Sequence, residues 1–221
     1  MTRPGKSSTD TLSRPRHVVP PPGYKINIRN PSESIILVDT QDNPGCGGSS
    51  DSTGLLHEML KQTLENAAIA MFYDPEVAQA AYSAGKGSEL TLSLGAKIES
   101  AQTPVVGQFK VINVSEGRFK ATGPFYRNAL MDIGPTAWLN LQGIDILVSS
   151  RKVQAADQSL FRHLGLEPAT KRILALKSSV HYRADFDSIA SKQLIVETPG
   201  ANVANLKRLT YHHLRPGVAC L

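Results

Sequence analysis

The sequence has few of the residues that mark disulfide-rich, zinc-finger or membrane proteins. Its 221 residues include two cysteines, Cys46 and Cys220, which are too few for a disulfide framework or a thiolate metal cage. No apolar run approaches the roughly 20 residues of a membrane-spanning helix, and the first residues lack the apolar segment of a secretion signal. These absences predict a cytoplasmic protein without a membrane partner.

Most of the chain also lacks an excess of positive charge. The formal net charge is +5, and residues 1–30 hold six basic residues and one acidic residue, so this segment accounts for the whole excess. A neutral remainder argues against nucleic acid as a partner of the folded part. We expect residues 1–33 to be a disordered, basic tail rich in Pro and Ser, and residues 34–221 to form one folded domain.

Complete catalytic and cofactor motifs are missing too. His57 and Glu58 begin a zinc-binding helix motif, but Lys61 stands where the second histidine is required. The glycines around Cys46 lack the third glycine of a dinucleotide fingerprint, and no histidine has a second histidine or a cysteine at metal-ligand spacing. We therefore predict no metal site made by this chain alone. Cys46 with His181 as its base remains a possible nucleophile pair, against the common role of a lone cysteine as a small hydrophobe.

The apolar patterns that are present predict an α/β (α+β) fold, a mixed β-sheet with flanking helices in a single domain. A β-branched run at 34–39 predicts a buried strand, and helical spacing from Thr53 predicts a helix with Asp51 or Thr53 as its N-cap. A strand at 68–73 and a helix at 75–85 follow, and this order implies a parallel strand pair with a crossover helix.

The rest of the chain predicts a β-rich middle section and a short α/β end. Gln142-Gly143 is a hairpin turn signal between two strands. The expected elements are strands at 89–94, 105–114, 118–121, 138–141 and 144–149, a helix at 157–164, and a last buried strand at 173–177.

Two segments carry polar groups where predicted strands end. One is the Gly-rich loop at 42–53, and the other is the segment 177–183. The loop's side chains could face a ligand or could cap backbone N–H groups in a turn, and the pattern supports both equally. The candidate site residues are Asp42, Asn43, Asp51, Thr53, Lys177, His181 and Arg183.

These segments resemble, in order, the C-terminal domain of the MlrC-like metallopeptidases, the family of microcystinase C. The matching segments are 42–45 with Asp51 and Thr53, 132–137, 150–154, 177–184 and 198–200, within about residues 34–216. The resemblance implies amide or peptide hydrolysis, as in microcystin degradation. It also implies zinc held mainly by an N-terminal domain, where this chain has only its basic tail. It assigns Asp42 and Asn43 to orienting groups near the metal, and Lys177, His181 and Arg183 to a substrate carboxylate or oxyanion.

Three interpretations follow from the resemblance. The chain could be the accessory half of a hydrolase for a peptide-like or small amide substrate, completed by an N-terminal catalytic domain in trans or by a homo-oligomer. It could instead be a non-catalytic small-molecule or anion-binding module, or a truncated product whose bare apolar surface seeks a partner. The family pattern has glycine at the positions of Cys46 and Ser52, so we expect a positive φ at these two residues and a ligand geometry of the loop that departs from that of the family.

Overall fold

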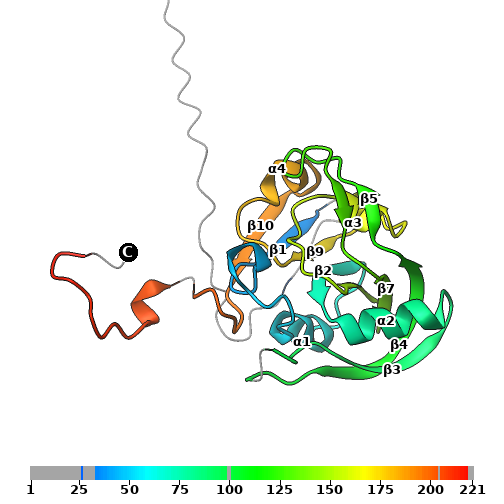
Figure 1. The fold of residues 1–221 in the computed structure, drawn as a ribbon, viewed down its shortest axis with the longest axis horizontal. Helices are drawn as coiled ribbons and strands as arrows, with labels where there is room; N and C mark the ends of the chain where they lie inside the picture. Colours follow the sequence, from blue (N-terminus) through cyan, green and yellow to red (C-terminus); the bar gives the residue numbers. More distant parts are fainter. Residues whose placement is uncertain (1–25, 27–32, 99–100, 204, 219–221) are drawn as a thin grey trace, which may run out of the picture.

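One eight-stranded mixed sheet organises the computed structural model, which describes residues 26, 33–98, 101–203 and 205–218 (Figure 1). Its strand order is β10-β1-β9-β2-β8-β7-β4-β3. The first five of these strands are parallel to one another, and the last three are antiparallel to their neighbours. The strands are β1 (Ile35–Asp39), β2 (Ala67–Tyr73), β3 (Glu89–Leu94), β4 (Val105–Ser115), β7 (Thr136–Leu141), β8 (Ile144–Ser149), β9 (Ile173–Leu176) and β10 (Lys192–Val196). This confirms the predicted mixed sheet and α+β class; the predicted tail at 1–33 lies almost wholly outside the described residues.

The parallel strands are apolar because both faces of this half of the sheet are covered. All five residues of β1 are buried. Ile35 and Leu37 point into one apolar core, and Ile36 and Val38 point into the other. A strand with apolar residues at every position is typical of a parallel sheet between two layers.

Two pairs of helices cover the two faces, as Figure 1 shows. The helices α1 (Gly54–Lys61) and α2 (Pro75–Ala84) bury Leu56 and Ala81 on the first core. The short helices α3 (Ser159–Arg162) and α4 (Arg183–Phe186) bury Phe161 and Phe186 on the second. A two-stranded sheet of β5 (Arg118–Lys120) and β6 (Leu130–Asp132) adjoins the second core through Phe119 and Met131.

The predicted hairpin between β7 and β8 is confirmed. Gln142 and Gly143 have φ values of 50° and 86°, so both turn residues lie in the left-handed region that a two-residue hairpin turn requires. The helix α2 also begins as predicted, since the Asp74 side chain accepts the Val77 N–H and Pro75 follows it.

Four details of the predicted fold are wrong. β1 and β2 are parallel but not paired, because β9 lies between them. The strand β10 follows β9, which is therefore not the last strand, and β6 was not expected. The helix predicted at 157–164 is shorter, four residues of α3.

The C-terminal segment beyond β10 leaves the sheet and ends in a stretch that projects from the domain (orange to red in Figure 1). Its large apolar side chains are exposed: Leu206, Leu209, Tyr211, Leu214 and Val218. Within the part of the chain that the structure describes, no helix has the length and apolarity to cross a membrane.

Candidate functional site

The carboxyl ends of the five parallel strands form one edge of the sheet, and ligands bind at this edge in open α/β sheets. The register places Val38 of β1 beside Leu176 of β9, so Asp39 and Lys177 leave adjacent strands together. The two polar segments predicted from the sequence are thereby brought to one place. The loops at this edge follow β1, β2, β8, β9 and β10.

Asp42 anchors the loop that follows β1. Its Oδ1 accepts the Ser50 N–H at 2.6 Å and the Ser49 hydroxyl at 3.0 Å, and its Oδ2 accepts the Ser52 N–H at 2.9 Å. The carboxylate is fully buried. Asp42 therefore folds the loop around itself, which is the capping role that the sequence left open.

Lys177 completes this network from the next strand. Its Nζ lies 2.7 Å from Asp42 Oδ2, 3.2 Å from Asp39 Oδ2, and 2.8 and 2.9 Å from the carbonyl and hydroxyl oxygens of Ser52. It also lies 4.7 Å from the ring centroid of Phe72. The side chain is 0% exposed, so in this structure all of its hydrogen-bonding capacity is spent inside the protein.

The electrostatics of this network favour the charged form of Asp42. Burial raises the pKa of Asp42, but the positive charge of Lys177 and the hydrogen bonds from Lys177 and Ser52 outweigh burial and hold the pKa below its ordinary value. Asp39 shares the lysine, and its Oδ1 accepts the Thr198 hydroxyl at 2.7 Å from the β10 side. The ion pairs thus connect the ends of β1 and β9, and the Thr198 hydrogen bond adds the segment after β10.

Asn43 shapes the tip of the same loop. Its Oδ1 accepts the Gly45 N–H and so caps the 3₁₀ turn Pro44–Cys46, while its Nδ2 donates to Ser179 Oγ at 2.9 Å. Nδ2 also lies 3.3 Å from the Sγ of Cys46, which is an exposed free thiol. Asn43 therefore ties the loop tip to the segment after β9.

Asp51 and Thr53 hold the loop to the region before β4. Asp51 Oδ2 accepts the Ile98 N–H at 2.6 Å, and Thr53 Oγ1 donates to the Thr103 carbonyl at 2.8 Å. The predicted side-chain cap of α1 is wrong, because Gln102 Oε1 accepts the N–H groups of Thr53 and Gly54 instead. The cap comes from a residue 48 positions along the chain from Gly54, which local sequence does not indicate.

The positive φ expected at Cys46 and Ser52 lies elsewhere in the loop. Ser50 has a φ of 62°, whereas Cys46 and Ser52 are not among the described residues with positive φ. The Ser50 N–H donates to Asp42, its hydroxyl donates to the Met71 carbonyl, and its carbonyl accepts the Tyr73 N–H. These three hydrogen bonds hold Ser50 in the left-handed region. The expectation failed because glycine at a position does not by itself imply a positive φ.

His181 is an exposed ionisable group at this edge. Its Nδ1 lies 3.2 Å from Gln154 Oε1, and its ring stacks on Phe125 with centroids 4.2 Å apart and planes inclined by 23°. Gln154 follows β8, is buried, and donates from Nε2 to Ser178 Oγ at 2.9 Å. Neither of these described contacts of His181 involves Cys46, so the nucleophile pair has no contact in its support.

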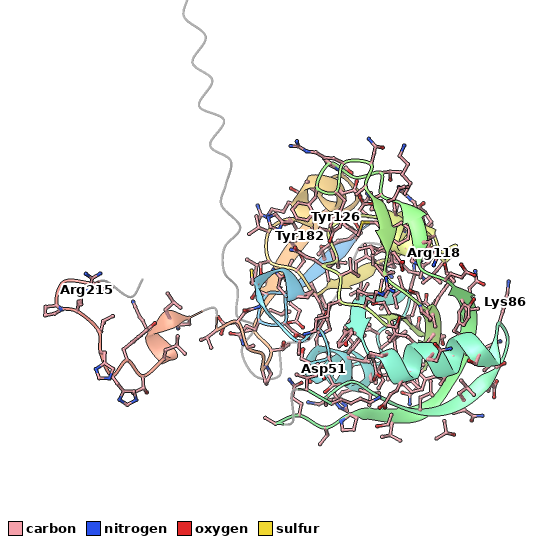
Figure 2. The ribbon with its side chains drawn as sticks, in the orientation of Figure 1. Asp51, Lys86, Arg118, Tyr126, Tyr182 and Arg215 are labelled. Carbon is pink, nitrogen blue, oxygen red and sulfur yellow. The ribbon has the colours of Figure 1, made fainter. Side chains whose placement is uncertain are left out.

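Arg183 begins α4 and is half-buried beside Tyr182. Burial raises the pKa of the Tyr182 phenol, and the charge of Arg183 opposes this rise. The phenol donates to Gln193 Oε1 at 2.7 Å. In Figure 2, Tyr182 and Tyr126 lie on the side of the sheet that α3 and α4 cover, and Asp51 lies near α1.

The candidate residues thus separate into a buried group and a group, His181 and Arg183, that is not fully buried. Asp42 and Lys177 are in direct contact inside the protein, and Asn43 joins them to the segment of His181 through Ser179. Two residues with clear roles, Asp39 and Gln154, were not among the candidates. Each stands at or just after the end of a predicted strand, and that position was the available signal.

The residues at this edge do not fit a zinc ion. Within the described ranges, no group of three or more His, Cys, Asp or Glu side chains is placed to hold a metal. Asp39 and Asp42 already share the Lys177 ammonium, which occupies the position between them. A zinc site usually requires at least three protein ligands, so no catalytic step at this edge is assigned to a metal held by this chain.

Comparisons with known proteins agree with the segments quoted from the sequence. The family described as MlrC C-terminus matches residues 37–213. Microcystinase C from Sphingomonas sp. is 32% identical over 163 residues, which cover 73% of this chain and 31% of that protein. The structure of a candidate metallopeptidase from Mesorhizobium sp. BNC1 superposes with a TM-score of 0.70 at 22% identity, covering 79% of this chain and 35% of that one. The chain spans about a third of the length of these relatives, and the structural likeness shows a shared fold.

Proposed function

This chain belongs to the MlrC C-terminus family, and from that membership we propose that it is the accessory half of an MlrC-like metallopeptidase. In this proposal it supplies one wall of a shared site for hydrolysis of a peptide-like or small amide substrate and is inactive alone. The observation that carries the proposal is the coverage of the curated relative, in which 73% of this chain corresponds to only 31% of a hydrolytic protein.

The buried and exposed groups take different roles in the proposal. Asp42, Asn43 and Lys177 hold the loop 42–53 in shape, because their hydrogen bonds are made to other parts of this chain. His181 and Arg183 are assigned to the substrate carboxylate or the developing oxyanion, since they follow β9 at the carboxyl edge and are not fully buried. The earlier assignment of Lys177 to substrate is replaced by this internal role.

Zinc, which the resemblance to metallopeptidases implies, is assigned to the part of the longer relatives that this chain does not span. The described residues offer no set of three ligands to such an ion. Asp51 and Thr53 are assigned to positioning the loop, through their bonds to the segment before β4.

The expected partner is an N-terminal catalytic domain in trans, or a second copy of the chain. The exposed apolar side chains of residues 206–218 support a contact with another protein surface, since a cluster of this kind is unusual in a monomer. The near-neutral charge of residues 31–221 gives no support to nucleic acid. A cytoplasmic setting, expected from the cysteine content, remains a proposal.

A reconstitution experiment tests the function. The full chain is assayed for cleavage of linearised microcystin with and without added zinc, and again after addition of the N-terminal two thirds of microcystinase C. We expect cleavage only in the zinc-containing mixture. Cleavage by the chain alone would overturn the accessory role, and a stable complex without any cleavage would overturn the hydrolytic one.

A non-catalytic anion-binding module is the second candidate, and the loop argues against it. The N–H groups of Ser50 and Ser52 point to Asp42 and not outward, and the Lys177 ammonium is buried beneath them. An anion cradle requires free N–H groups that face the ligand. Titration of the chain with inorganic phosphate in a calorimeter is expected to give no saturable heat at millimolar concentration.

A further inference from the structure

The two nitrogens of the His181 ring have different surroundings. Nδ1 faces Gln154 Oε1 at 3.2 Å, and Phe125 covers one face of the ring. Gln154 is itself held at two points, because its side-chain Nε2 donates to Ser178 Oγ and its backbone carbonyl accepts the Tyr126 hydroxyl at 3.1 Å. Burial raises the pKa of Tyr126 to about 12, so the phenol remains a donor to this carbonyl.

An amide oxygen can only accept a hydrogen bond, so the nitrogen that faces it must carry the hydrogen. We propose that Gln154 is a positioning residue that holds neutral His181 as the Nδ1–H tautomer and leaves Nε2 as an outward acceptor. The partner of a histidine's second nitrogen commonly decides which nitrogen reacts. Resting on the proposed function, Nε2 would first take a proton from the attacking water, and the Nε2–H of the imidazolium that results would then donate to the developing oxyanion or the substrate carboxylate.

Two other histidines provide internal references for the tautomer. His57 Nε2 lies 2.9 Å from the Thr103 carbonyl, so His57 is expected as Nε2–H. His163 Nδ1 lies 3.1 Å from the Ser159 carbonyl, so His163 is expected as Nδ1–H. A carbonyl oxygen accepts in both cases, so one spectrum should contain both tautomers at known positions.

The experiment measures the tautomers by NMR on the full chain labelled with ¹⁵N-histidine. Long-range ¹H–¹⁵N correlations are recorded at about pH 8.5, where an ordinary imidazole is neutral. We expect a pyrrole-type Nδ1 and a pyridine-type Nε2 for His181, as for His163, and the opposite pattern for His57. An Nε2–H pattern for His181, or an even mixture of both tautomers, would overturn the proposal.

Three variants connect the tautomer to Gln154. Gln154→Met keeps the length but removes the acceptor, and the loss of one hydrogen bond should move the tautomer ratio by about fivefold toward Nε2–H. Gln154→Glu keeps the Oε1 acceptor and should retain Nδ1–H. Gln79→Met, which replaces an exposed glutamine of α2, is the matched control and should change nothing at His181.

An unchanged ratio in the Met variant at position 154 would overturn the role of Gln154. Should that variant not fold, Ser178→Ala replaces it, because removing the anchor of Gln154 Nε2 should shift the ratio in the same direction, and no shift would again overturn the proposal. The tautomer is measured on the chain alone. A chain with the expected tautomer that fails to restore cleavage would refute the proposed function and leave the positioning role intact.

Discussion

Lys177 and His181 both follow β9, four residues apart, but their surroundings are opposite. Lys177 is enclosed by Asp39, Asp42 and Ser52 and has no exposed surface. His181 stands at the surface, with one nitrogen on Gln154 and its ring on Phe125. The buried lysine therefore stabilises the edge of the sheet, and the exposed imidazole is available to a ligand. The difference teaches that charge at a strand end does not by itself mark a binding group.

The largest expected effect comes from removing the buried cation. Lys177→Met leaves Asp39 and Asp42 buried without their counter-ion, and we expect the free energy of unfolding to fall by about 3–5 kcal/mol. Urea denaturation measures this loss. Lys61→Met is the matched control, since Lys61 forms only an exposed pair with Glu58 and should cost less than about 0.5 kcal/mol. Equal losses in the two variants would contradict the proposed difference between buried and exposed cations.

Asp42→Asn tests the same network from the acidic side. The four partners of Asp42 act as donors here, so an amide NH₂ would oppose at least one of them, at a cost of about 2–3 kcal/mol. Because the pKa of Asp42 is lowered, its contribution is fully present above the ordinary pKa of 3.8 and is lost as the pH falls through the lower folded value. Denaturation from pH 6 to about pH 2 should therefore show a shallower loss of stability in the variant. An identical acid profile would mean that Asp42 is not held charged.

Two glycines at the loop tip separate tight packing from backbone strain. A Cβ at Gly48 would lie 2.8 Å from the Asn43 backbone N and O, so Gly48→Ala should cost about 1–3 kcal/mol. Gly47 has a φ of 91° and open space around it, so Gly47→Ala should cost about 1 kcal/mol from strain alone. Thermal unfolding of both variants ranks them, and a larger loss at Gly47 would argue that the loop is held less tightly than its contacts suggest.

His181→Ala should have the smallest effect on stability. The imidazole is exposed and makes one hydrogen bond to a side chain, so the free energy of unfolding should change by less than about 0.5 kcal/mol. Cleavage in the reconstituted mixture should nevertheless fall by at least tenfold. A stability loss comparable to that of Lys177→Met would place His181 with the structural groups instead.

The local elements could be predicted because their signals are local. Alternating or continuous apolar runs identified most of the strands, and Asp74 with Pro75 identified the start of α2. The pairing of β1 could not be predicted, since its partners β9 and β10 come from the other end of the chain. For the same reason, no local sequence pattern indicates that β9 lies between β1 and β2 in the sheet.

The candidate site followed the same division. The two polar segments were found because they follow strands, and the register confirms that they lie at one edge. Their roles depended on contacts between distant residues. Lys177 turns inward to pair with Asp42, which lies 135 positions away in the sequence. The role of Gln154 depends in the same way on a contact between distant segments, since Gln154 follows β8 and its partner His181 follows β9. The family resemblance added the biochemical context that strand patterns do not contain.

The position of β1 in the sheet also determines when the protein can finish folding. β1 is made well before its neighbours in the sheet, since 157 positions separate Ser34 from Ser191 and 138 separate Asp39 from Lys177. A nascent chain must keep this apolar strand unpaired until β9 has left the ribosome, and β10 follows later still. Such distant pairing slows folding and prolongs the exposure of an apolar, aggregation-prone strand. We therefore expect newly made chains to depend on chaperones that shield β1 during this interval.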